Sequence, residues 1–288
     1  MPRFVMDFAH IAIIGPGLLG GSIALALRER FHEVRISLWA RRAEAVAESE
    51  ARNIAHQAST NLAEVVCGAD LVIFCTPIGV MPALAAQMLP HLAPNALVTD
   101  VGSVKARAVE ELAPILGGRF VGSHPMAGSD QAGLHAARPG LFEDAVCILT
   151  PTPAQPVEPV ERVAAFWRGL GSRVHFLSPE KHDETVAVIS HFPHLLAAAL
   201  VEMVCSQNAD ALPYCGSGFR DTTRVAAGPA AMWAEILESN RPAVRNSIRS
   251  MIKQLTRVDA LLDDPDALRD FLVRAKAGRD ALRLPLRP

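Results

Sequence analysis

Residues 10–22 read HIAIIGPGLLGGS, an apolar run that passes through Gly15, Gly17 and Gly20 into a helical pattern. A strand, a glycine loop and a helix in this order are typical of a unit that binds a dinucleotide. The first glycine permits the tight turn, the second lets the backbone approach a pyrophosphate, and the third lets helix and strand pack closely. The helix start adds free N–H groups and the positive end of its dipole. We therefore predict a cofactor loop, with an ordinary glycine-rich turn as the alternative, made of Gly15, Gly17, Leu18, Leu19 and Gly20.

The end of the next predicted strand decides which dinucleotide is preferred. Enzymes that use NAD place Asp or Glu there, about 20 residues beyond the loop, to bind the ribose 2′-hydroxyl. This chain has Arg41 and Arg42 instead, and arginine can bind a 2′-phosphate that a carboxylate would repel. We predict NADP rather than NAD, although both arginines could also be solvated residues at the start of the next helix. Thr76 and Pro77, at the end of a further predicted strand, are expected to line the same cofactor.

The first 178 residues alternate short apolar runs with helical patterns, as in a parallel sheet with crossover helices. The predicted strands are residues 10–15, 33–40, 70–76, 96–101, 120–124, 145–150 and 173–177, and the predicted helices are 18–30, 43–53, 81–92, 104–116 and 157–170. From Ser178 onward, strand-like runs vanish and long helical patterns take over. We predict an α/β protein, with a Rossmann-type doubly wound sheet in residues 1–178 and an all-helical domain in residues 179–288.

The composition excludes some partners. The formal net charge of −2 over 288 residues gives no overall field to attract nucleic acid or an anionic membrane. Five cysteines without CxxC or zinc-finger spacing indicate reduced, mostly buried thiols of a cytoplasmic protein, and no signal peptide is expected. The longest apolar stretch, residues 186–204, contains two histidines, a proline and a glutamate, which are costly in lipid. We predict a buried helix of a soluble domain rather than a membrane span.

Polar residues follow two of the predicted strands, where a doubly wound sheet forms its ligand crevice. Residues 100–105 read DVGSVK, and Ser103 is either a substrate contact or the N-cap of the next helix. Residues 122–130 read GSHPMAGSD, in which Pro125 restricts the backbone beside His124. Imidazole has the unperturbed pKa that suits proton transfer near neutrality, so His124 is a candidate base rather than a structural histidine.

The helical half holds a further polar cluster. His191 and His194 have a spacing that could suggest a metal, but Pro193 interrupts the helix and no other ligand cluster is evident. We therefore predict no metal. Arg224, in the segment 216–224 (GSGFRDTTR), can anchor a substrate carboxylate, with a surface salt bridge as the alternative.

Together, GPGLLGGS, DVGSVK, SHPMAGSD, SHFPH and GFRDTTRVA occur in the order seen in prephenate and arogenate dehydrogenases. The chain resembles this family from residue 10 to about residue 240; SHPMAGSD and GFRDTTRVA are the specific segments, whereas the glycine loop is shared with many dehydrogenases. The resemblance implies oxidative decarboxylation of prephenate or arogenate, a step of tyrosine biosynthesis, with hydride transfer to the nicotinamide. It also implies a homodimer formed through the helical domain.

The resemblance implies roles for single residues as well. His124 would accept the proton of the ring hydroxyl, Ser103 would bind that hydroxyl and orient the histidine, and Arg224 would bind a carboxylate. The residues implied to line or order the substrate pocket are His194, Asp130, Asp183 and Trp233. Prephenate and arogenate differ by a keto and an amino group, and Asp130 or Asp221 could pair with the ammonium, so the substrate stays open. We expect the chain, which ends at Pro288, to lack the regulatory ACT domain of some members.

Two alternatives remain. A different two-domain NADP-dependent hydroxy-acid dehydrogenase would usually place a catalytic lysine on the helical domain, but Lys181 precedes the main predicted helix. A non-catalytic NADP-binding sensor would not need Ser103, His124 and Arg224 together.

Overall fold

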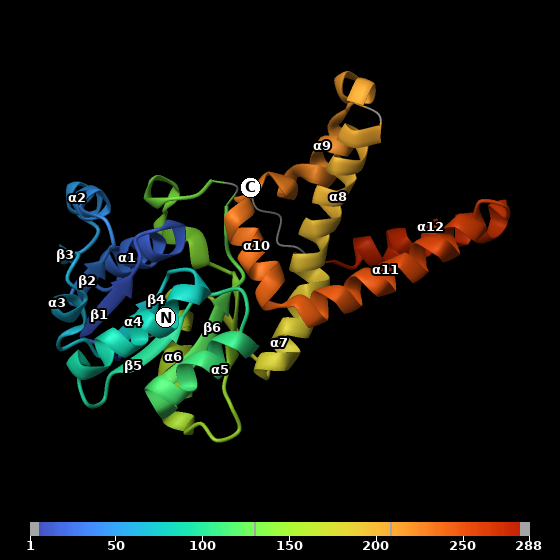
Figure 1. The fold of residues 1–288 in the computed structure, drawn as a ribbon. Helices are drawn as coiled ribbons and strands as arrows, with labels where there is room; N and C mark the ends of the chain where they lie inside the picture. Colours follow the sequence, from blue (N-terminus) through green and yellow to red (C-terminus); the bar gives the residue numbers. More distant parts are fainter. Residues whose placement is uncertain (1–5, 130, 208, 283–288) are drawn as a thin grey trace. The chain divides into compact units, whose positions relative to one another are not determined.

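The computed structural model describes residues 6–129, 131–207 and 209–282. The chain divides into two compact units, Met1–Arg241 and Pro242–Pro288. The first holds the sheet and part of the helical region (Figure 1), and the second is a pair of helices. These compact units divide the chain after Arg241 and not after residue 178, so they do not test the predicted domain boundary, which stays a prediction.

Within the described residues, eight strands form one sheet in the order β3-β2-β1-β4-β5-β6-β7-β8. Their bounds are β1 (His10–Ile14), β2 (Arg35–Trp39), β3 (Gln57–Ser59), β4 (Leu71–Phe74), β5 (Leu97–Asp100), β6 (Phe120–Pro125), β7 (Val146–Thr150) and β8 (Arg173–Phe176). The first six in this order give the Rossmann arrangement, with its switch of direction between β1 and β4. The predicted Rossmann-type fold is confirmed.

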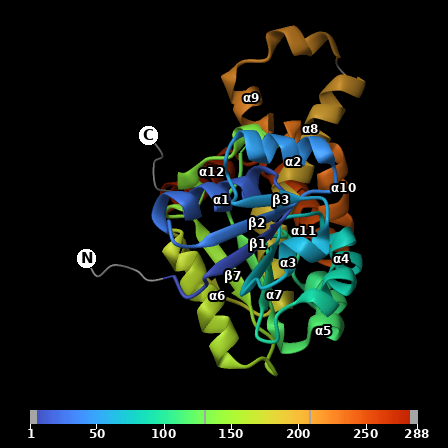
Figure 2. The ribbon, with the colours of Figure 1, turned by 90° about the vertical axis from the view of Figure 1, so that its left-hand side faces the viewer.

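Helices cover both faces of the sheet. They are α1 (Leu18–Arg30), α2 (Ala43–Ala51), α3 (Leu62–Val66), α4 (Met81–Met88), α5 (Ala106–Leu116) and α6 (Val157–Gly169). One apolar core lies under α1 and α6, and a second lies under α3, α4 and α5 (Figure 2). Because both faces are covered, strands such as β1 and β4 are apolar and buried at every position.

The structure differs from the predicted sheet in three respects. β7 runs antiparallel to β6, because the connection holds the short 3-10 turns Leu134–Ala136 and Pro139–Phe142 and no crossover helix. β3 and α3 were not predicted, since they span only three and five residues. The expectation of mostly buried cysteines is wrong: of the five, all among the described residues, Cys147 alone is buried, and Cys67 and Cys205 are exposed.

The described residues beyond 178 form helices and helical turns and no strand, as predicted. The first unit contains α7 (Pro179–Val186), a π-helical turn (Ala187–His191), α8 (Phe192–Gln207), α9 (Ser217–Thr223) and α10 (Ala230–Ser239). The second unit contains α11 (Arg241–Leu261) from its second residue onward, and α12 (Pro265–Asp280).

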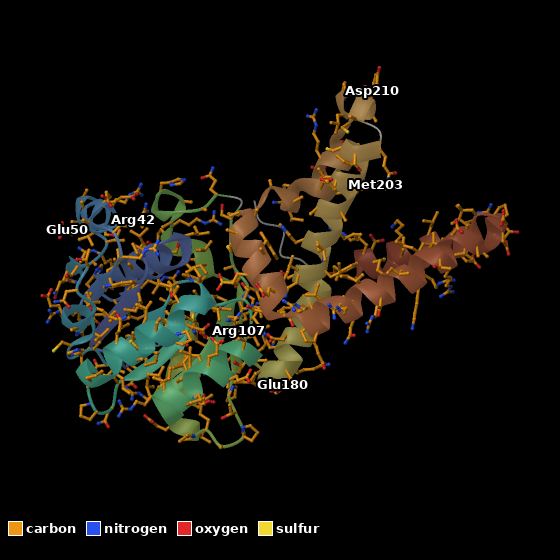
Figure 3. All side chains as sticks on the ribbon, viewed as in Figure 1. Arg42, Glu50, Arg107, Glu180, Met203 and Asp210 are labelled. Carbon is orange, nitrogen blue, oxygen red and sulfur yellow. The ribbon has the colours of Figure 1, made fainter. Side chains whose placement is uncertain are left out.

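The run Pro179–Gln207 is long and apolar enough to cross a membrane by length and composition alone. Its predicted burial is wrong for the single chain, because only 17% of its most apolar window is buried. Leu196 is 40% exposed, and Met203, near the end of α8 (Figure 3), is 47% exposed. The helix packs on its own unit through a few residues such as Phe192 and Ala197, and leaves much of its apolar surface uncovered.

Candidate functional site

The carboxyl ends of four neighbouring parallel strands bring the predicted segments together. Gly15 and Gly17 follow β1, Thr76 and Pro77 follow β4, Ser103 follows β5, and His124 lies near the end of β6. Since β1, β4, β5 and β6 are parallel neighbours, these segments lie along one edge of the sheet. In doubly wound sheets this edge forms the ligand crevice.

The glycine loop has the shape that a dinucleotide requires. A Cβ on Gly20 would lie 2.1 Å from the Gly15 carbonyl oxygen, so only glycine allows this contact between helix and loop. A Cβ on Gly17 would meet nothing within 4 Å, which leaves the backbone open to a phosphate. The first amides of α1, including those of Leu18 and Leu19, have no partner within the helix.

Two further features fit a dinucleotide bound at the glycine loop. Thr76 Oγ1 is buried and has no hydrogen-bond partner among the described residues, although its methyl group borders the Gly15 turn. The Gly15 amide donates to the Trp39 carbonyl at 2.9 Å, which ties the glycine loop to the end of β2. Arg41 and Arg42 follow there, exposed, and Arg42 lies at the start of α2 (Figure 3).

His124 is the end of a chain of three buried side chains. Its Nδ1 lies 2.8 Å from His182 Nε2, and His182 Nδ1 lies 2.7 Å from Asp183 Oδ1. His182 and Asp183 both belong to α7, so the helical segment reaches the end of β6 at this point. No hydrogen bond to His124 Nε2 is found among the described residues, so this nitrogen can serve a substrate.

Asp183 also holds the start of α5. Its two carboxylate oxygens accept the backbone amides of Lys105 at 2.8 Å and Ala106 at 3.0 Å. The N-cap residue of α5 is Lys105, so the alternative that Ser103 caps this helix is wrong. Ser103 instead lies half-buried in the loop before the helix.

Lys105 is fully buried behind this loop. Its ammonium forms an ion pair with the Asp100 carboxylate and donates to the Ser123 carbonyl at 2.8 Å. Asp100 also accepts the amides of Gly102 and Ser123 at 2.8 and 3.1 Å. The pair thereby fixes the loop that carries Ser103 against the strand that carries His124.

Burial keeps these imidazoles neutral. It lowers the pKa of His124 well below its usual value, and the neighbouring His182, Lys105 and His191 act in the same direction. Burial also lowers the pKa of His182, against the opposing effect of the Asp183 carboxylate. The pKa of His191 falls to about 4 for the same reason. A neutral His124 can accept a proton near pH 7.

A second group of predicted residues adjoins the first. The ring of His194 stacks on Trp233 with 3.6 Å between centroids and 10° between planes. Gly228 must be small here, because a Cβ would lie 2.4 Å from the Trp233 indole nitrogen. Arg224, which is exposed, begins the 3-10 turn Arg224–Ala227 that leads to Gly228. Asp130 lies outside the described residues.

The two groups are joined through residues that the sequence analysis did not assign. The Asn240 amide donates to the Asp183 carbonyl at 2.8 Å and lies 3.1 Å from His191 Nδ1. His191 in turn lies edge-on to Trp233, with 6.4 Å between ring centroids. Asn240 and His182 carried no motif signal beyond their position beside residues already singled out, and Lys105 ended the DVGSVK segment without an assigned role. Within the described residues, no group of three or more His, Cys, Asp or Glu is placed to hold a metal ion.

Comparison with known proteins covers both halves of the chain. The family model described as the nucleotide-binding domain of prephenate dehydrogenase matches residues 23–176, and the one described as its dimerization domain matches residues 178–274. The cyclohexadienyl dehydrogenase of Zymomonas mobilis is 33% identical over 283 residues, which is 96% of this chain and 97% of that protein.

Solved structures agree with this. Prephenate dehydrogenase from A. aeolicus, in complex with hydroxyphenyl propionate and NAD+, has a TM-score of 0.89 at 32% identity, covering 94% of this chain and 96% of that chain. Synechocystis arogenate dehydrogenase has a TM-score of 0.82 at 30% identity, covering 94% of this chain and 99% of that chain. With both family models matched in order and relatives aligned along nearly the whole length, the chain belongs to the prephenate dehydrogenase family.

Proposed function

We propose that this protein catalyses the oxidative decarboxylation of prephenate, arogenate or both, with NADP as the hydride acceptor. The observation that carries the proposal is the buried, neutral His124 at the crevice edge, with Nδ1 engaged by His182 and Nε2 left for a substrate. Relatives named for prephenate, arogenate and cyclohexadienyl substrates all align along this chain, which supports the substrate class and leaves the choice within it open.

The residues divide the work as follows. His124 removes the proton of the ring hydroxyl as the C4–H bond breaks, so a carbonyl forms at C4, and Ser103 orients that oxygen. The bound dinucleotide supplies the acceptor for the hydride. The C1–carboxylate bond then breaks, carbon dioxide leaves, and its electron pair enters the ring and reaches the C4 oxygen. His124 returns the proton to this oxygen, which gives the phenol, while Arg224 holds the substrate by a carboxylate.

The proposed preference for NADP rests on Arg41 and Arg42. Both guanidinium groups are exposed, and neither makes an ion pair or hydrogen bond with another side chain in the described ranges. No carboxylate stands at the end of β2 to repel a 2′-phosphate. We expect a lower KM for NADP than for NAD. The double variant Arg41→Ala, Arg42→Ala should lose most of this preference while keeping activity with NAD; an unchanged ratio would reject the assignment.

The proposal includes a cytoplasmic homodimer formed through the helical region. Among the described residues, α8 leaves apolar side chains such as Leu196 and Met203 exposed, and apolar surface of this kind favours an interface. The match to a family model described as a dimerization domain supports a second copy as the partner at this interface. Sedimentation of the purified protein without detergent tests this: a dimer is expected, and a monomer or a detergent-requiring aggregate would contradict it.

The test of the activity is steady-state NADPH formation with prephenate and arogenate compared side by side. His124→Asn should lower kcat by about 10² to 10⁴ and leave cofactor binding intact. The matched control is His175→Asn, because His175 lies exposed on β8. Cofactor binding without turnover of either substrate would favour the non-catalytic sensor, and turnover by another hydroxy acid alone would favour the other dehydrogenase class.

A further inference from the structure

We infer that His182 and Asp183 are positioning residues that select the tautomer of His124 and share the proton it takes from the substrate. This relay deepens the proposed function and rests on it. Asp183 was expected only to order the pocket, and His182 had no assigned role. The inference stands on two contacts that share the His182 ring: its Nδ1 lies 2.7 Å from Asp183 Oδ1, and its Nε2 lies 2.8 Å from His124 Nδ1.

The geometry allows one arrangement of hydrogens when both rings are neutral. An ionised Asp183 can only accept, so His182 Nδ1 carries the hydrogen and donates to Oδ1. A neutral His182 then has a lone pair at Nε2, which can only accept, so His124 Nδ1 must carry the donated hydrogen. The remaining nitrogen, His124 Nε2, is left with the lone pair that a general base needs. The other tautomer would turn an N–H toward the substrate hydroxyl and abolish proton abstraction.

The same line stabilises the charge formed during turnover. Lys105 before α5 and His191 in the π-helical turn disfavour the protonated ring of His124, and so does His182 on α7 when it is itself protonated. A neutral His182 instead accepts the hydrogen of His124 Nδ1 and so favours the protonated ring. The nearest opposing charge on the line is Asp183, which raises the pKa of His182. When His124 gains a proton at Nε2, its Nδ1 hydrogen can shift toward His182, and the positive charge moves toward the carboxylate. No net proton is gained or lost in this shift.

Asp183 is held too firmly to leave this line. Its Oδ1 also accepts the Lys105 amide, and its Oδ2 accepts the Ala106 amide, so both oxygens are fixed at the start of α5. Its backbone carbonyl accepts from Asn240. His182 is fully buried, which leaves no room for the imidazole to rotate to another partner. The relay is therefore preorganised before a substrate binds.

Kinetics of two variants separate tautomer selection from proton sharing. His182→Ala removes both, and kcat should fall about 10- to 100-fold while the substrate KM changes less than about threefold, a smaller loss than removing the base. His182→Gln can place an amide oxygen near the position of Nε2, so it keeps an acceptor for His124 but cannot pass on a proton. It should recover part of kcat. In both variants the ascending limb of the pH profile of kcat/KM should move to lower pH, because the imidazolium of His124 loses its link to Asp183.

The control is His175→Gln on the exposed face of β8, which should match the wild type. A His182→Ala variant with normal kcat and an unmoved pH profile would overturn the relay. The relay would also be overturned if His182→Ala impaired folding and KM as well as kcat and if His182→Gln restored none of them, since that pattern marks a purely structural residue.

A second measurement does not depend on turnover. Nitrogen-15 NMR of the histidine rings in the wild-type protein, without substrate, should show both His124 and His182 with the hydrogen on Nδ1. A hydrogen on Nε2 of either neutral ring would overturn the relay even if the enzyme is active. Absence of activity in the wild type with the predicted tautomers would instead reject the proposed function and leave only the tautomer selection standing.

Discussion

Replacing Lys105 with methionine is expected to destabilise the protein by about 3–5 kcal/mol, the usual cost of removing one partner of a buried ion pair. The side chains of Lys105 and Asp100 are both 0% exposed. Methionine preserves most of the apolar volume, so the cost is electrostatic: Asp100 stays buried without a counter-ion, and the Ser123 carbonyl loses a donor at 2.8 Å. Two amide donors, from Gly102 and Ser123, remain on the carboxylate, which keeps the expected loss within that range.

Urea unfolding followed by circular dichroism measures this loss. The matched control is Lys181→Met, because the Lys181 side chain is 64% exposed and its pairing with Glu184 should contribute less than about 1 kcal/mol. The double variant Asp100→Asn, Lys105→Met should lose less than the sum of the two single variants, with a coupling of about 1–3 kcal/mol. If Lys105→Met were as stable as Lys181→Met, the assignment of a buried ion pair that fixes the Ser103 loop would be wrong.

Two further predictions follow from the glycine loop and the buried histidines. Gly17→Ala should keep the melting temperature but weaken dinucleotide binding at least about tenfold by calorimetry, because its Cβ meets no protein atom within 4 Å yet occupies the approach of the phosphate. Gly20→Ala should lower both the melting temperature and the affinity for the dinucleotide, because its Cβ would overlap the Gly15 oxygen. Equal effects of the two would contradict this reading. The contribution of the buried histidines to stability should be constant above about pH 6.5 and fall as the pH drops, because the unfolded chain then binds protons that the folded His124 and His191 do not. For His191, whose pKa falls from 6.5 to about 4, the loss approaches about 3 kcal/mol near pH 4. A melting temperature that rises when the pH is lowered from 6.5 to 5 would contradict this predicted loss of stability.

Several features of this protein were determined by its local sequence. The glycine loop between a strand and a helix predicted the Rossmann-type sheet, because two of its constraints act within a few residues: Gly15 has a positive φ, and a Cβ on Gly20 would overlap the Gly15 oxygen. The apolar runs located seven of the eight described strands, since a sheet covered on both faces needs apolar residues at every position. His124 was singled out by its place at a strand end.

Tertiary structure decided the rest, because it depends on residues far apart in the chain. His182 lies 58 residues beyond His124, and no local pattern indicates that α7 reaches the end of β6. The direction of β7 depends on how a connection without a crossover helix returns to the sheet. Lys105 looks like an ordinary helix-start lysine, and only the burial of Asp100 beside it makes it part of the site. Sequence periodicity indicates which face of a helix or strand is apolar. Packing between distant elements determines which polar groups are buried together. That shared loss of water shifts their pKa values and favours hydrogen bonds among them.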